Sequence, residues 1–130
     1  MILKIDFDSE IPIYIQIKNQ IIEGIAIGNL EEGEELPSVR GLAEDIGVNM
    51  HTVNKAYSIL KDEGYLKIDR RKGAFISLDL RASQEKFEDE LKYNLSYYMA
   101  ECFNRGIDKN KIKDEIEKLF GQFQGGRELR

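Results

Sequence analysis

Hydrophobic residues recur at helical spacing in the first quarter of the chain. Four isoleucines occupy every fourth position and therefore share one helical face: Ile13, Ile17, Ile21 and Ile25. Pro12 suits the first turn of such a helix, and Gly28 suits its end. The pattern predicts an amphipathic helix over residues 12–28.

Two further helices are predicted after a short acidic connector. Ser38 is a good N-cap for a short helix over residues 39–46, which Gly47 ends. Asn49 then caps a longer helix, and Gly64 supplies the left-handed residue at its end. The chain thus predicts two helices joined by a tight turn.

Two short runs with near-alternating apolar residues follow, separated by the basic segment RRKG. The runs are YLKID and AFISL, and such alternation is typical of β-strands. The pattern predicts a β-hairpin whose tip carries positive charge.

Helical spacing returns in the last third of the chain. Apolar residues recur at intervals of three, four and one over residues 83–106, and a final helix starts at Asp108. We expect the tail QGGRELR to be frayed. The apolar positions that we expect to make a protein contact are Phe87, Leu91, Leu95, Tyr98, Met99, Phe103, Ile112, Ile116 and Phe120.

This order of elements predicts a mainly α fold with a small β-wing. We expect a winged helix-turn-helix domain over residues 1–79, followed by a two-helix region over residues 80–130. The two final helices are too short to enclose a sizeable core of their own. Two copies of the chain can associate through these helices, or the helices can fold back on the winged domain, and both can be partly true. We expect association to dominate.

The segment VRGLAEDIGVNMHTVNKAYSIL combines several features of a helix-turn-helix. Ala43 is the small residue that closely crossing helices need, and Gly47 tolerates the positive φ of the turn. Apolar residues that fix the angle between the helices are Leu42, Ile46, Val48, Val53, Ala56 and Leu60. This joint match is much more specific than a lone glycine pattern.

Charge is segregated along a chain whose formal net charge is −5. Residues 6–46 hold two basic and ten acidic side chains, whereas residues 47–76 hold six basic and three acidic ones. A local basic surface therefore exists within an acidic protein, and it coincides with the second helix of the pair and the hairpin.

The start of that second helix carries polar side chains and no acid. A recognition helix enters the DNA major groove with its N-terminal end first. Asn can pair with adenine and Lys with phosphate or guanine, and the free N–H groups of a helix N-terminus favour phosphate. The residues that we expect to face DNA are Asn49, His51, Thr52, Asn54 and Lys55. Taken singly, Asn49 could serve only as a cap and Lys55 could be only solvated.

Polar and basic residues before and after this helix extend the surface. Ser38 and Arg40 lie at the start of the preceding helix, a usual place for phosphate contacts. Arg70, Arg71 and Lys72 at the hairpin tip would reach the neighbouring minor groove or its phosphates. The structural alternative is that these charges are merely solvated.

Composition leaves little room for catalysis. One histidine and one cysteine cannot supply a zinc site, and no glycine-rich phosphate loop occurs. We therefore expect no enzyme, no metal and no cofactor. No apolar run approaches the roughly 20 residues of a membrane span, and the acidic start is unlike a secretory signal. We expect a cytoplasmic protein.

Three segments together resemble the GntR family of bacterial transcription regulators. They are PIYIQIKNQI, IGNLEEGEELPSVRGLAEDIGVNMHTVNKAYSILKDEGYL and KGAFI, which cover nearly all of residues 11–78. The short two-helix C-terminal region resembles the YtrA subfamily, whose members lack a larger effector domain. The resemblance implies a homodimer held by the C-terminal helices, an inverted-repeat DNA operator and repression.

The family's DNA contacts map onto residues already singled out. They correspond to Arg40, to the start of the recognition helix from Asn49 to Lys55, and to Arg71, Lys72 and Gly73 at the wing. Relatives usually have Gly-x-Gly at the wing tip, whereas this chain has Arg71 in place of the first glycine.

Two questions stay open at the level of sequence. A winged helix can also serve as a protein-docking module that binds no DNA, and the acidic first half would suit a basic partner. A small-molecule effector, if one exists, would need a pocket between the C-terminal helices or between them and the winged domain. Tyr93, Tyr97 and Tyr98 are candidates to line it, although aromatic residues on such a helix more often belong to a core.

Overall fold

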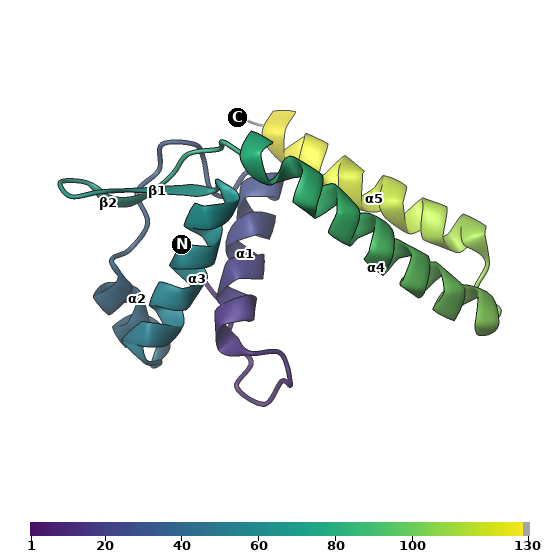
Figure 1. Cartoon of the computed structure of the whole chain (residues 1–130), viewed down its shortest axis with the longest axis horizontal. Coiled ribbons are helices and arrows are strands. Elements are labelled where there is room, and N and C mark those ends of the chain that lie inside the picture. The colour runs from purple at the N-terminus through teal and green to yellow at the C-terminus, as the bar shows by residue number, and fades with distance from the viewer. Residues whose placement is uncertain (129–130) are drawn as a thin grey trace.

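The computed structural model describes residues 1–128, with side chains through Phe123. Its elements in chain order are α1 (Ile13–Ile27), α2 (Val39–Ile46), α3 (Met50–Glu63), β1 (Leu66–Asp69), β2 (Gly73–Ile76), a 3-10 turn η1 (Arg81–Ser83), α4 (Gln84–Asn104) and α5 (Lys109–Glu128). Figure 1 shows α1, α2, α3 and the β1–β2 hairpin gathered in one unit, from which α4 and α5 extend to the opposite side. The predicted fold class is confirmed, and the predicted elements agree with the observed ones to within a few residues.

The core of the winged unit lies where α1, α2 and α3 meet the hairpin. The predicted stripe of α1 is buried there through Ile17, Ile21 and Ile25, and α3 contributes Val53 and Leu60. Burial of each such side chain stabilises the fold by about 1.5–3 kcal/mol before entropy is counted. This core fixes α3 relative to α1 and the wing.

The wing is broader than the sequence predicted. Residues 33–36, in the acidic connector before α2, pair with β2 through backbone hydrogen bonds. The Leu36 amide donates to the Ala74 carbonyl at 2.9 Å, and the Ile76 amide donates to the Glu34 carbonyl at 2.9 Å. An isolated two-stranded hairpin is only marginally stable, so this third segment supports the wing.

An N-terminal segment lies along α1 and is held by two glutamine side chains. Gln20 accepts from the Lys4 amide at 2.9 Å and donates to the Lys4 carbonyl at 2.7 Å. Gln16, one turn earlier, makes the same pair of bonds with Asp6 at 2.8 and 2.9 Å. The segment therefore extends the winged unit ahead of α1.

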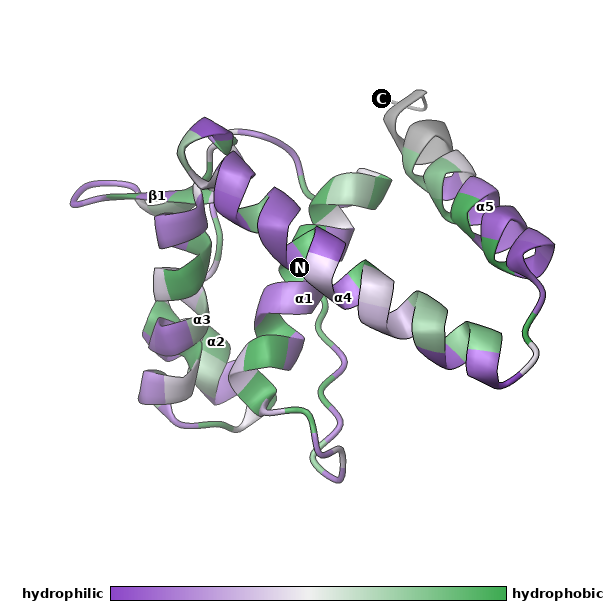
Figure 2. Cartoon of the chain, turned by 45° about the vertical axis from the view of Figure 1, so that its right-hand side comes forward, coloured by the Kyte–Doolittle hydropathy of each residue, from purple (hydrophilic) through white to green (hydrophobic). Residues whose placement is uncertain are grey.

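The apolar stripe of α4 is exposed to solvent. Phe87 is 56% exposed and Phe103 is 84% exposed, and no residue of α4 is buried. The alternative that both helices fold back on the winged unit is therefore wrong for α4, whereas α5 does pack against α1. Figure 2 shows α4 and α5 diverging from the turn that joins them. The expectation that the tail QGGRELR, residues 124–130, is frayed is wrong as far as Glu128, because α5 continues to that residue. Residues 129–130 lie outside the described part.

The base of α4 is tied to the end of α3. The Ser83 hydroxyl donates to the Glu63 carbonyl at 2.7 Å, and the Asp79 amide donates to the Gly64 carbonyl at 2.8 Å. Gly64 has a φ of 97°, and a Cβ at this position would lie 1.9 Å from the Asp79 carbonyl oxygen. The connector can cross α3 this closely only because residue 64 lacks a side chain.

Candidate nucleic-acid interface

The turn between α2 and α3 has the geometry that the sequence predicted. Gly47 adopts a φ of 73°, and the Val48 amide donates to the Ala43 carbonyl at 3.0 Å. Tyr57 on α3 reaches back to the loop before α2, where its hydroxyl donates to the Pro37 carbonyl at 2.7 Å. Burial raises the pKa of the Tyr57 hydroxyl above its usual range. These contacts hold α2 and α3 at one angle.

Two of the predicted contact residues act as helix caps. The Asn49 carboxamide oxygen accepts from the His51 amide at 2.7 Å, and the Ser38 hydroxyl accepts from the Gly41 amide at 3.0 Å. Both side chains satisfy amide groups that a helix start leaves unpaired. What they retain for a ligand is the NH₂ group of Asn49 and the hydroxyl proton of Ser38.

The remaining predicted residues of α3 lie at its surface. His51, Asn54 and Lys55 are exposed, and Thr52 is half-buried. Arg40 is exposed in the first turn of α2. No acidic residue occurs between Asp45 and Asp62. The exposed end of α3 thus presents hydrogen-bond donors and positive charge without competing carboxylates.

Lys55 does not extend freely into solvent. Its ammonium lies 4.0 Å from the centroid of the Tyr14 ring, which belongs to the first turn of α1. Such a cation–π contact is worth about 0.5–1 kcal/mol at an exposed site. Sequence reasoning missed Tyr14, since only the packing of α1 against α3 brings the ring to the recognition helix. The contact restricts where the ammonium can point.

The wing tip is formed without strain despite the missing glycine. Asp69 accepts from the Arg71 amide at 2.6 Å and from the Lys72 amide at 3.4 Å through the same carboxylate oxygen. Gly73 alone takes a positive φ there, at 75°. The Arg71 departure from the family pattern is therefore compatible with the turn, because residue 71 needs no left-handed conformation.

The cations of the wing are exposed, and one of them contacts an aromatic ring. The Lys72 ammonium lies 5.9 Å from the centroid of the Phe75 ring, a loose cation–π contact. Arg70 and Arg71 are exposed. Figure 1 shows the hairpin projecting on the same side as α2 and α3, away from α4 and α5. The hairpin and the α2–α3 pair therefore lie on the same side of the molecule.

Candidate sites of other kinds are scarce in the described part of the chain. Residues 1–128 contain no group of three or more His, Cys, Asp or Glu residues arranged to hold a metal ion. No helix among these residues is long and apolar enough to cross a membrane. The three tyrosines proposed to line an effector pocket are exposed on α4, and none of them lines the cavity at the base of that helix. That cavity lies nearer the start of α4 than Tyr93.

Comparison with known proteins connects this geometry to a family. A profile of the gntR family of bacterial regulatory proteins matches residues 13–76. Over 126 residues the chain is 32% identical to the HTH-type transcriptional repressor YtrA of Bacillus subtilis strain 168, an alignment that covers 96% of this chain and 97% of YtrA. The chain belongs to the GntR family. The similarity to YtrA spans α4 and α5 as well as the winged unit, in agreement with a YtrA-like member.

Solved structures of GntR proteins support the same assignment. YtrA from Sulfolobus acidocaldarius, a GntR-family transcription factor, matches with a TM-score of 0.65 and 41% identity over 77% of this chain and 99% of that one. The DNA-binding domain of AraR in complex with operator ORX1 matches with a TM-score of 0.52 and 28% identity over 58% of this chain and 96% of that one. The chain is thus a GntR-family transcriptional regulator with a winged helix.

Proposed function

We propose that this regulator is a repressor that binds an inverted-repeat operator as a homodimer in the cytoplasm. Residues 1–79 form the DNA-binding part, and residues 80–130 form the dimerisation part. The observation that carries the proposal is the acid-free, exposed start of α3, flanked by Arg40 and by the cations of the wing. The relatives are transcriptional regulators, and no catalytic reaction is proposed.

The N-terminal end of α3 enters the major groove. Asn54 and His51 are placed on its exposed side to read base edges, and Thr52 to touch a thymine methyl or a phosphate. Arg40 contacts a phosphate from the start of α2, where the helix N-terminus adds its own attraction for an anion. The ring of Tyr14 directs Lys55 along the side of α3, toward the backbone rather than straight into the groove.

The wing follows the neighbouring minor groove. Arg70, Arg71 and Lys72 protrude at its tip, and the loop backbone is stiffened by the bonds from Asp69. Phosphate contacts fix orientation and supply the salt-dependent part of affinity, whereas base contacts supply specificity. In this proposal α3 specifies the site and the wing strengthens the complex.

Dimerisation covers the exposed apolar stripes of α4 and α5. Monomeric proteins rarely expose large continuous apolar patches, and this one includes Leu91, Leu95, Tyr98 and Phe103. A second copy presents the same stripe, so a two-fold interface buries both at once. Two recognition helices spaced by about 34–36 Å then match half-sites one DNA turn apart.

A gel-shift titration with the DNA upstream of the regulator's own gene tests this proposal. Wild type is compared with Arg40→Ala and with Arg81→Ala, which removes an equal charge from an exposed side chain on η1. We expect a retarded band for wild type and Arg81→Ala, and binding at least about tenfold weaker for Arg40→Ala. Equal binding by all three proteins, or no band on this DNA and on neighbouring promoters, would contradict the proposal. The second outcome would favour a protein-docking module.

Sedimentation of the same preparation tests the dimer. Leu95→Glu places a charge in the exposed stripe, and Asn94→Glu places the same charge on the adjacent exposed position of α4. Because neither side chain is buried within one copy, both variants should fold. We expect only Leu95→Glu to shift the protein to monomer, and a monomeric wild type would overturn the dimer.

A further inference from the structure

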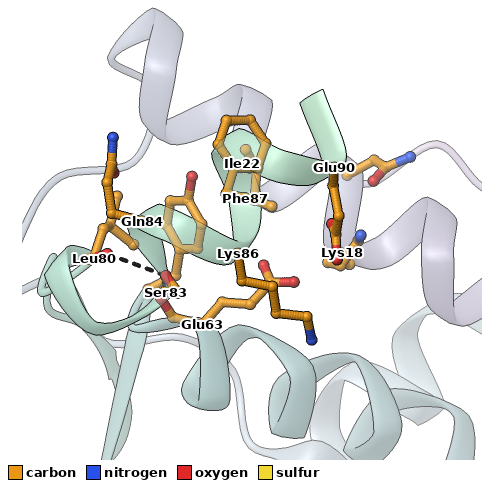
Figure 3. A pocket seen from close by; sticks show the side chains of 11 residues that line it. Lys18, Ile22, Glu63, Leu80, Ser83, Gln84, Lys86, Phe87 and Glu90 are labelled. Carbon is orange, nitrogen blue, oxygen red and sulfur yellow. Dashed lines mark hydrogen bonds between the residues drawn. The ribbon is translucent and has the colours of Figure 1, made fainter. Parts of the chain in front are cut away.

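A cavity of about 440 Å³ lies at the junction between the winged unit and α4. Its walls come from α1, from the end of α3 with the adjoining Tyr65, and from the first turns of α4 (Figure 3). Ligand pockets typically occupy about 300–1,000 Å³. The volume therefore suits a small molecule rather than a protein segment.

One side of this cavity is apolar. Its apolar lining comes from Ile22 of α1, Phe87 of α4 and Leu80 of the connector (Figure 3). Phe87 lines the cavity and is 56% exposed. An aromatic ring left uncovered in a concave site favours an occupant with an apolar body.

The rest of the lining carries balanced charge. Two ammonium groups, of Lys18 and Lys86, are accompanied by two carboxylates, of Glu63 and Glu90. Among the side chains that the structure describes, none of these four groups makes an ion pair within 4.0 Å, since the ion pairs found there join Arg81 with Asp79 and Arg105 with Glu101. A ligand of one sign would be attracted and repelled about equally, whereas a zwitterion can match both signs.

We propose that this cavity is a regulatory site for a small amphipathic zwitterion, a molecule of amino-acid or dipeptide type with an apolar side chain. The ligand carboxylate pairs with Lys18 or Lys86, its ammonium pairs with Glu63 or Glu90, and its side chain covers Phe87. The site assignment stands on the cavity alone, and its regulatory role rests on the proposed DNA-binding dimer.

The position of the cavity explains how a bound ligand would affect DNA binding. Glu63 is the last residue of the recognition helix α3, and its backbone carbonyl accepts from Ser83 just before α4 begins. A ligand that contacts Glu63, α1 and α4 together sets the direction in which α4 leaves the winged unit. In a dimer held through α4, that direction sets the spacing of the two recognition helices.

Binding is tested first on the full chain without DNA, by NMR titration of backbone amides. The probes are leucyl-phenylalanine as zwitterion, 3-phenylpropionate as the anion alone and phenethylamine as the cation alone. We expect saturable shifts around Tyr65 and Phe87, with the dipeptide binding at least about fivefold tighter than either single-charge compound. Equal binding of the three probes, or no saturable shift with any of them, overturns the site.

A matched pair of variants ties binding to the cavity. Lys86→Gln removes one lining ammonium, and Lys92→Gln removes an exposed ammonium of α4 that does not line the cavity. We expect Lys86→Gln alone to weaken dipeptide binding by about fivefold. If a second copy fills the cavity instead, no probe binds and Lys86→Gln raises the dimer dissociation constant, which also overturns the proposal.

The regulatory role is tested separately with operator DNA. We expect the dipeptide to change the operator affinity of wild type and Lys92→Gln, while Lys86→Gln binds DNA normally and responds less. Saturable dipeptide binding without any change in DNA affinity would overturn regulation but keep the site. Failure of wild type to bind DNA both without and with the dipeptide counts against the proposed function, and not against the cavity.

Discussion

Two glycines at helix ends provide a controlled test of how the winged unit is joined to α4. Gly47 ends α2 and Gly64 ends α3, and both adopt the left-handed conformation, with φ values of 73° and 97°. A Cβ added at Gly47 meets open space, whereas one added at Gly64 lies 1.9 Å from the Asp79 carbonyl oxygen. Alanine at the two positions therefore imposes a similar backbone penalty and a very different steric one.

The expected magnitudes follow from these surroundings. Gly47→Ala should destabilise the fold by about 1–2 kcal/mol, the usual penalty for a left-handed alanine. Gly64→Ala incurs the same penalty and also forces the Asp79 carbonyl to retreat by roughly 1.5 Å to reach an ordinary contact. Such a retreat breaks the Asp79–Gly64 and Ser83–Glu63 hydrogen bonds, each worth about 0.5–1.5 kcal/mol. We expect a total near 3–4 kcal/mol for Gly64→Ala from these terms.

Urea and thermal unfolding measure the difference in stability between Gly47→Ala and Gly64→Ala. Both are done at one protein concentration, because association of the chain would otherwise change the apparent stability. The two costs differ by about 2 kcal/mol, and at about 4–8 °C per kcal/mol Gly64→Ala should lower the melting temperature by roughly 8–16 °C more than Gly47→Ala. Equal losses for both variants would refute the reasoning. They would mean that the connector does not cross α3 closely in solution.

Two more expectations concern Tyr57 and Tyr14. Tyr57→Phe should cost about 1 kcal/mol through loss of the hydrogen bond to Pro37. Because burial raises the pKa of Tyr57, the wild type should lose stability as pH rises above about 10, where tyrosine in the unfolded chain ionises. Tyr57→Phe should lose less stability over the same pH range. Parallel pH profiles of the two proteins in urea unfolding would contradict this. Tyr14→Leu should weaken operator binding about two- to fivefold by releasing Lys55, while Tyr14→Phe retains the ring and the affinity. Operator binding is measured by fluorescence anisotropy. Equal operator affinity of the two variants would show that the ring does not orient Lys55.

Local patterns were enough to predict the elements of the winged unit. Ser38 and Asn49 mark helix starts through capping chemistry, and Gly47 and Gly64 mark ends through positive φ. These signals act over a few residues, so they can be recognised without knowing the fold. The exposed polar start of α3 followed from the same local reasoning.

Features that depend on distant residues were missed. Backbone hydrogen bonds such as that from Leu36 to Ala74 join the acidic connector to the wing through an isolated β-bridge, and nothing in the composition of the connector indicates this. The contact between Tyr14 and Lys55 likewise arises only when α1 packs on α3. The cavity at Phe87 requires three elements to meet, whereas the sequence directed attention to tyrosines further along the same helix.

The salt dependence of operator binding tests the central claim most directly. Each protomer presents five cations on the proposed DNA-binding face, namely Arg40, Lys55, Arg70, Arg71 and Lys72. If half to all of these contact phosphates in a dimer, the logarithm of affinity should fall against the logarithm of salt concentration with a slope of roughly −4 to −9. We predict a slope in that range, made shallower by about two units in Arg40→Ala and unchanged in Arg81→Ala. A slope near zero, or one that does not depend on Arg40, would contradict DNA recognition by this face.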